Sequence, residues 1–96
     1  MSPINKKKLN LLRFKLDMLD NELLKLIKKR SNLVNEVLKV KNHKNEIIDQ
    51  KRIEFILKKI KKKSIKLKID PKITSRIWKN IIWSFIDYEK RNFKMK

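Results

Sequence analysis

A few cations stand out from the general positive charge of the chain by their type and position. Lysine is the usual cation of these 96 residues, and arginine occurs at five positions: Arg13, Arg30, Arg52, Arg76 and Arg91. An arginine kept on a lysine-rich background suggests a site that needs a planar, bidentate hydrogen-bond donor, as a carboxylate does. Arg30 is the clearest case, because it interrupts a row of leucines. The chemistry that this predicts is the binding of a small anion.

Lys41 and Arg13 differ in whether they can join Arg30 at one anion. Lys41 follows Arg30 by eleven residues, which on a helix places both side chains within about 20° of one direction, roughly 16 Å apart along the axis. Arg13 precedes Arg30 by seventeen residues, roughly 25 Å along a straight helix, so it can share a small ligand with Arg30 only from an antiparallel partner chain. The alternative is structural, with Arg30 in a buried ion pair or setting the register between helices.

The element that carries these cations is a long helix predicted over residues 5–42. One of its faces is apolar with heptad spacing: Leu9, Leu12, Leu16, Leu19, Leu23, Leu26, Leu33, Val37 and Val40. At about 1.5 Å per residue, such a helix is roughly 60 Å long, more than one small domain can cover. The pattern therefore predicts a partner, most simply a second copy of the chain.

The rest of the sequence predicts a loop, a short helix and a medium helix, which makes the fold all-α with three helices per chain. Residues 42–49 break the pattern, and Asp49 is the expected N-cap of a short helix that fades in the lysine-rich stretch 58–68. Asp70-Pro71 then starts a medium helix over 71–93. Its predicted apolar stripe is Ile73, Ile77, Ile81 and Phe85. Glu89 extends this stripe, either as a surface charge or as an acid held in a basic pocket.

Composition excludes several classes of protein. The sequence has no Cys and no Gly, so disulfides, thiolate zinc sites and glycine-rich phosphate loops are impossible. The single histidine, His43, is interpreted as a capping or surface residue. No apolar run approaches the ~20 residues of a membrane span, and no signal peptide is recognisable. We therefore expect a cytoplasmic protein with one domain over residues 1–96 and no metal or cofactor.

The net charge of +18 by itself suggests a nucleic-acid or acidic-membrane ligand. The lysines, however, are spread along the whole chain, and only 7% of the residues are aromatic. Lys, Ile and Asn also share A/T-rich codons, so base composition explains much of the excess. Nucleic acid is therefore not expected as the main ligand. A basic helical nucleic-acid-binding protein stays open as an alternative, as does a non-catalytic dimeric partner protein.

The chain resembles the all-helical chorismate mutase family over nearly its whole length. The resemblance rests on polar residues spaced over a leucine frame: Arg13, Arg30, Lys41, Asp49, Arg52 and Glu89. It implies an intertwined homodimer of three-helix chains with two shared active sites, each taking Arg13 from the neighbouring chain. It also implies a small dicarboxylate substrate, chorismate or isochorismate.

The same resemblance implies roles for four of these residues. Arg13 and Arg30 hold the two carboxylates of the substrate, Lys41 binds a carboxylate and the ether oxygen, and Glu89 donates to the ether oxygen. The reaction is pericyclic, so it needs a restricted substrate conformation and cations near the breaking bond rather than a nucleophile. Glu89 must be protonated to donate, so we expect turnover to improve at mildly acidic pH.

Asp49 and Arg52 are implied to line the mouth and the ring side of the site, as in the mutases. Two other positions, Ile53 and Phe85, depart from the pattern of the family. The mutases usually follow this arginine with a Glu that binds the C4 hydroxyl of the substrate, but Ile53 stands here, and Phe85 replaces the usual Ser. Both changes resemble the branch that includes isochorismate-pyruvate lyase, which makes salicylate and pyruvate. Chorismate mutase and this lyase therefore both stay open.

Overall fold

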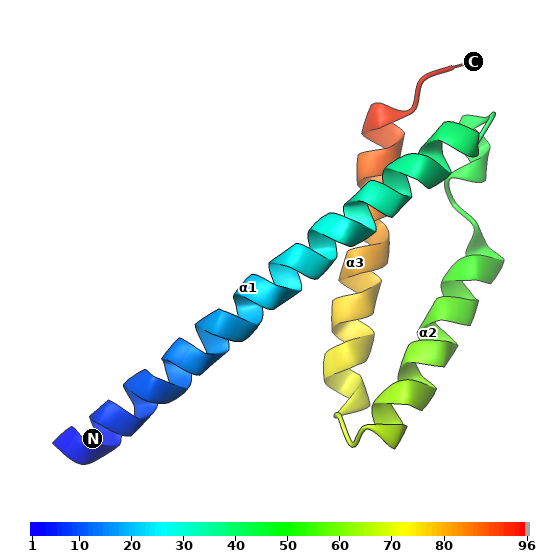
Figure 1. Cartoon of the computed structure of the whole chain (residues 1–96). Coiled ribbons are helices and arrows are strands. Elements are labelled where there is room, and N and C mark those ends of the chain that lie inside the picture. Colours follow the sequence, from blue (N-terminus) through cyan, green and yellow to red (C-terminus); the bar gives the residue numbers. More distant parts are fainter. Residues whose placement is uncertain (96) are drawn as a thin grey trace. The chain divides into compact units, whose positions relative to one another are not determined.

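The computed structural model describes residues 1–95, which form helices joined by short connections (Figure 1). Helix α1 spans Pro3–Val40, the 3-10 turn η1 spans Lys44–Glu46, α2 spans Gln50–Lys66 and α3 spans Pro71–Asn92. No β-strand occurs within the described residues. The predicted all-α class, with one long, one short and one medium helix, is confirmed. The chain divides into two units, Met1–Leu33 and Val34–Lys96.

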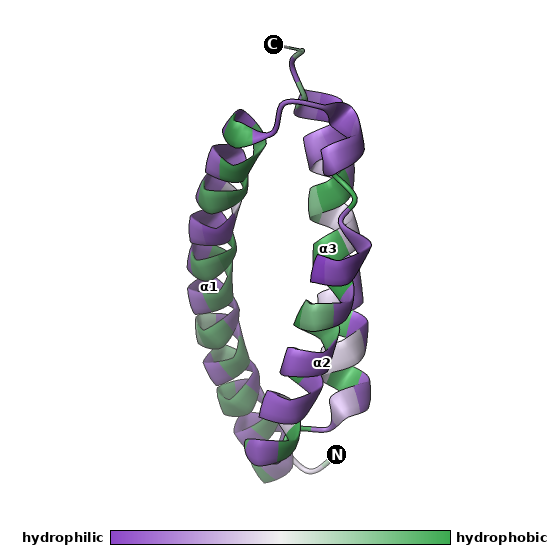
Figure 2. Ribbon diagram, turned by 90° about the vertical axis from the view of Figure 1, so that its right-hand side faces the viewer, coloured by the Kyte–Doolittle hydropathy of each residue, from purple (hydrophilic) through white to green (hydrophobic). Residues whose placement is uncertain are grey.

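Helix α1 is continuous because nothing in its interior breaks it. Pro3 stands at its first position, where a missing backbone N–H costs nothing, and the hydroxyl of Ser2 accepts from the amide of Asn5 at 3.2 Å. No residue of α1 is buried. The seam leucines are exposed, for example Leu19 at 60% and Leu23 at 54%, and hydrophobic residues recur along the helix in Figure 2. The seam predicted from the sequence therefore exists but is not covered within one chain.

The second unit has a small core where α2 and α3 lie side by side (Figure 1). The core consists of Ile47, Ile53, Ile82 and Ile86, which are 3–7% exposed. Ile82 and Ile86 are one turn apart on α3, and Ile53 comes from the first turn of α2. Ile47 comes from the connection between α1 and α2, so this loop also anchors the core.

The turn from α2 to α3 replaces the usual glycine with a lysine. Lys68 has φ of 58°, and the amides around it close the end of α2: Lys68 N donates to the carbonyl of Ile65 at 3.1 Å, and Ile69 N to that of Ser64 at 2.9 Å. This pair of hydrogen bonds is the Schellman motif, whose left-handed residue is normally glycine. Because the chain has no glycine, it bears the steric cost of this conformation on a lysine.

The predicted starts of the second and third helices are confirmed, whereas the long helix begins at Pro3, two residues before its predicted start. The side chain of Asp49 accepts from the amide of Arg52 at 3.0 Å, and that of Asp70 accepts from the amide of Lys72 at 2.9 Å, with Pro71 in the first turn. The predicted end of the long helix is two residues too late, because α1 ends at Val40.

The second helix is predicted to fade in the lysine-rich stretch 58–68, and α2 ends within this stretch, after continuing through most of it. Helix α2 continues to Lys66, because its inner side keeps the helical period through the lysine run. Ser64 is 3% exposed. Its hydroxyl donates to the carbonyl of Ile60 at 2.7 Å and shares a hydrogen bond with the hydroxyl of Thr74 on α3, also 2.7 Å. A buried polar contact therefore holds the far end of the hairpin together.

The face that α3 buries differs from the predicted stripe. Ile73 and Ile77 are 55% and 46% exposed, whereas Thr74 and Ile82 are 8% and 5% exposed. Helix α3 is apolar on two neighbouring sides, and α2 covers only one of them. The sequence pattern alone does not distinguish the two sides.

Candidate active site

Lys41, which is partly buried, and Glu89, which is buried, form an ion pair in the second unit. The Nζ atom of Lys41 lies 3.2 Å from Oε1 of Glu89, and the two side chains are 18% and 8% exposed. Lys41 follows the last residue of α1, and its amide still bonds to the carbonyl of Leu38 at 3.3 Å. The other ion pairs found among residues 1–95 have side chains at least 65% exposed. Lys41 and Glu89 therefore differ from them in being removed from water.

The burial of Glu89 answers the question that its sequence position left open. It is an acid held inside the fold rather than a surface charge on a last turn, since the residue is 6% exposed. A buried carboxylate needs a compensating partner, which Lys41 supplies. While Glu89 is ionised, it neutralises the positive charge of Lys41. When it is protonated, it becomes a hydrogen-bond donor and leaves that charge available to another anion.

Lys41 and Asp49 line one hollow of about 460 Å³ at the start of α2. This volume lies within the roughly 300–1,000 Å³ of small-molecule sites. The other residues that line it were not predicted from the sequence: Glu46, Ile48, Gln50 and Lys51. Glu46 and Ile48 belong to the connection after α1, whose broken periodicity predicted a loop but no lining role, and Gln50 and Lys51 begin α2.

Three other predicted site residues lie on α2 and α3. Arg52 is exposed in the first turn of α2, with the carbon of its guanidinium 5.5 Å from the ring centroid of Phe55. Ile53 belongs to the core and is 7% exposed, and it has no polar side-chain atom. Phe85 is half-buried on α3.

Arg13 and Arg30 lie on the part of α1 that belongs to the first unit. Arg13 is exposed and Arg30 is half-buried. Because α1 is continuous, their separation is roughly 25 Å along the helix axis. The two guanidinium groups of one chain therefore do not meet at one small ligand.

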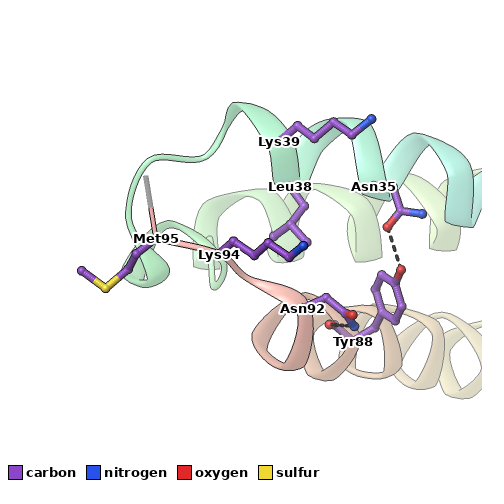
Figure 3. Close-up of a pocket in the computed structure, with 7 residues that line it drawn as sticks. All are labelled: Asn35, Leu38, Lys39, Tyr88, Asn92, Lys94 and Met95. Atoms are coloured by element: carbon purple, nitrogen blue, oxygen red, sulfur yellow. Dashed lines mark hydrogen bonds between the residues drawn. The ribbon is translucent and has the colours of Figure 1, made fainter.

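A hydrogen bond that the sequence did not reveal ties the end of α1 to α3. The hydroxyl of Tyr88 donates to Oδ1 of Asn35 at 2.7 Å, in a second hollow of about 490 Å³ between these segments (Figure 3). Tyr88 directly precedes Glu89, and Asn35 lies on the last two turns of α1, which lead to Lys41. This contact therefore helps to position both partners of the buried ion pair.

His43 lies between α1 and η1 and is exposed, as expected of a surface residue, and its amide donates to the carboxylate of Glu46 at 3.0 Å. No group of three or more His, Cys, Asp or Glu residues in the described part of the chain is arranged to hold a metal ion. None of the described helices is both long enough and apolar enough to cross a membrane.

Residues 12–90 match the family model of chorismate mutase type II. This range includes every predicted site residue from Arg13 to Glu89. The chain therefore belongs to the all-helical chorismate mutase family, as its spacing of cations over a leucine frame predicted. No curated protein and no solved structure matches the chain significantly.

Proposed function

We propose that the protein is a chorismate mutase that rearranges chorismate to prephenate for aromatic amino-acid synthesis, as a cytoplasmic homodimer of single-domain chains. Membership of the family supports this assignment over most of the sequence. The observation that carries it is the buried pair of Lys41 and Glu89 beside a hollow of small-molecule size. It offers one cation and one ionisable donor in a place with little water.

In the proposed mechanism, the cations select one conformation of a flexible dianion. Arg30 and the partner subunit's Arg13 bind the two carboxylates, which holds the substrate in the compact shape that the rearrangement requires. Lys41 lies against the ether oxygen, where negative charge develops as the C–O bond breaks. No group of the protein forms a covalent bond, which agrees with a chain that lacks Cys and a credible nucleophile.

In the proposed mechanism, the site is active when Glu89 is protonated. Its ionised form cancels the charge of Lys41 and repels a developing oxyanion. Its protonated form donates a hydrogen bond to the same oxygen and leaves Lys41 cationic.

The homodimer is proposed from the exposed seam of α1. A row of leucines that are more than half exposed in one chain forms a long apolar stripe, which marks an association surface. An antiparallel copy covers this stripe and brings the partner subunit's Arg13 toward Arg30. Each site then takes residues from both chains.

The decisive experiment is an assay of the purified protein with chorismate, together with a pair of arginine variants. Arg30→Ala is expected to reduce kcat/KM by about a thousandfold, the scale of losing a transition-state cation, with the dimer intact. Arg76→Ala is the matched control, because Arg76 is exposed on α3. Equal activity in the two variants contradicts the proposed role of Arg30.

Shared sites are tested by mixing two inactive variants. Arg13→Ala and Arg30→Ala chains are each expected to be inactive as homodimers. In a heterodimer, both changes fall in the same one of the two sites, and the other site is complete. The mixture is therefore expected to regain activity, and a mixture as inactive as its components contradicts sharing between chains.

Isochorismate-pyruvate lyase is the second candidate, favoured by one observation. Ile53 is buried and apolar where the resemblance places a Glu that binds the substrate hydroxyl. A site that hydrogen-bonds this hydroxyl discriminates for it, and an isoleucine does not. Assays of both substrates, read by formation of prephenate or salicylate, separate the two reactions, which would use the same cations.

A further inference from the structure

Helix α2 has the highest density of positive charge of the three helices. Its 17 residues include eight basic residues and a single acid, Glu54. Helix α1 has ten basic and four acidic residues over 38, and α3 has five and two over 22. The lysines that are spread along the sequence are therefore unevenly distributed over the fold.

The lysines of α2 share one side of the helix. At about 100° per residue, Lys51, Lys58, Lys62 and Lys66 fall within about 80° of one another. All four are exposed, and none of the ion pairs found among residues 1–95 involves them. The opposite side, with Ser64, packs against α3. Helix α2 therefore presents its charged side to solvent and keeps its apolar side covered.

An aromatic ring lies within this charged surface. Phe55 is 54% exposed, and two cations lie near its ring: the guanidinium carbon of Arg52 at 5.5 Å and Nζ of Lys59 at 5.8 Å from the centroid. The ring also lines a hollow of about 410 Å³ whose other lining residues are all lysines: Lys58, Lys59, Lys62, Lys63 and Lys66. The hollow thus combines a flat apolar surface with a row of ammonium groups.

We propose that this surface, the basic face formed by Phe55, Lys58, Lys59, Lys62, Lys63 and Lys66, binds single-stranded nucleic acid. Such binding typically combines a positive groove that follows the backbone with an aromatic side chain on which a base stacks. From Phe55 to Lys66 the helix rises roughly 16 Å, and the five lysines along it can each contact one phosphate. The proposal goes beyond the mutase activity and does not depend on it.

The fold groups cations that are far apart in the sequence. In the sequence, the lysines are dispersed and aromatic residues are few, which did not predict a nucleic-acid site. In the fold, five of these lysines and one phenylalanine line a single hollow. A stacking surface beside a row of cations is the combination that sequence-independent binding of single strands uses.

A lipid surface fits the basic face less well. A basic helix that binds membranes inserts its apolar side between the lipids, but the apolar side of α2 packs against α3. The ring of Phe55 lines a hollow together with five lysines. This arrangement suits a base inserted among the lysines better than a flat membrane.

The proposal is tested by fluorescence anisotropy of the whole protein with labelled oligothymidylate over a range of salt concentrations. Five phosphate contacts on a single strand give a slope of about −3.5 for log affinity against log salt, at about −0.7 for each. Removing three cations with Lys58→Gln, Lys59→Gln and Lys62→Gln is expected to reduce that slope to about −1.4. Phe55→Leu is expected to weaken binding about tenfold with the slope unchanged.

The matched control is the triple variant Lys6→Gln, Lys7→Gln and Lys8→Gln, which removes the same charge from the start of α1. Glutamine is a good helix former, and equal helical circular dichroism in both triple variants ensures that folding is unchanged. An equal loss of affinity in both shows that net charge alone attracts the oligonucleotide and overturns the proposal. So does absence of binding at low salt, or a Phe55→Leu variant that binds as the parent does.

The lipid alternative is measured in a separate experiment. Vesicles of phosphatidylcholine and phosphatidylserine in a ratio of about three to one carry the anionic headgroups that attract basic segments. The proposal expects weak binding to them, equally affected by the two triple variants. Vesicle binding that is tighter than oligothymidylate binding and is lost only in the α2 variant assigns the basic face to lipid instead.

Discussion

Helix α1 and the α2–α3 hairpin follow the same helical period but differ in what covers their apolar residues. In the hairpin, the four core isoleucines are 3–7% exposed, whereas Leu19 and Leu23 of α1 are 60% and 54% exposed. Burying one such side chain contributes about 1.5–3 kcal/mol. Periodicity thus determines which face of a helix is apolar, but a second element must be present before that face contributes to stability. The hairpin supplies its own cover, and α1 depends on another surface.

The strongest way to test this difference is to place a charge in the seam of α1. Leu23→Lys is expected to abolish the homodimer, because two buried ammonium groups without partners cost about 3 kcal/mol each. The measurements are molar mass by light scattering and helical circular dichroism. Both are expected to fall.

Asn21→Lys is the control, since position 21 lies about 200° around the same helix from position 23. Residues 21 and 23 are both exposed in the single chain, so the chain by itself predicts no difference between the two variants. If both stay dimeric and equally helical, the seam is not the association surface.

The second prediction compares ion pairs in the two regions. Glu89→Ala leaves the partly buried Lys41 without its partner and is expected to reduce the free energy of unfolding by about 3 kcal/mol. Glu22→Ala breaks the pair with Lys25 on α1, whose side chains are 67% and 71% exposed, and is expected to cost less than about 1 kcal/mol. Urea unfolding of both variants measures the difference. Equal losses would mean that burial does not decide the strength of the Lys41 pair.

Much of the fold followed from the sequence because it depends on local signals. The start of α2 at Asp49 and the start of α3 at Asp70-Pro71 are set by side chains that cap amides two or three residues away. The long helix required only an uninterrupted period without Gly or Pro. These features are decided within one or two turns of the chain.

The features that the sequence did not reveal depend on residues far apart. Glu89 is buried because Lys41, 48 residues earlier, reaches it, and α2 extends through its lysines because Ser64 meets Thr74 across the hairpin. For α3, two apolar sides were available, and only packing against α2 decides which is buried. For the site, the sequence predicted Lys41, Asp49 and Glu89, and the structure brings Lys41 to each of the other two.

The third prediction concerns the pH dependence of the proposed reaction. If protonated Glu89 donates to the ether oxygen, kcat/KM is highest at acidic pH. It falls about tenfold for each pH unit once the acid ionises, because the protonated fraction falls by that factor. Glu89→Gln keeps a donor and no charge at every pH, so its profile is expected to be flat. Initial rates of prephenate formation over a pH series measure this. A parent enzyme whose rate is independent of pH and unchanged in the glutamine variant shows that Glu89 is not the donor.

The smallest predicted effect concerns the left-handed backbone of Lys68, which destabilises the hairpin and has no counterpart in α1. Lys68 holds a left-handed backbone, with φ of 58°, which is about 1 kcal/mol less favourable for a residue with a Cβ than for glycine. Lys68→Gly is therefore expected to raise the free energy of unfolding by about 1 kcal/mol in urea.

Lys66→Gly, two residues earlier in the last turn of α2, is the control with the same substitution. It is expected to lower the free energy of unfolding by about 0.5–1 kcal/mol, because glycine is unfavourable inside a helix. Only a left-handed backbone at position 68 makes glycine favourable there and unfavourable at position 66. Changes of the same sign in the free energy of unfolding of the two variants would therefore show that the turn at Lys68 is not strained.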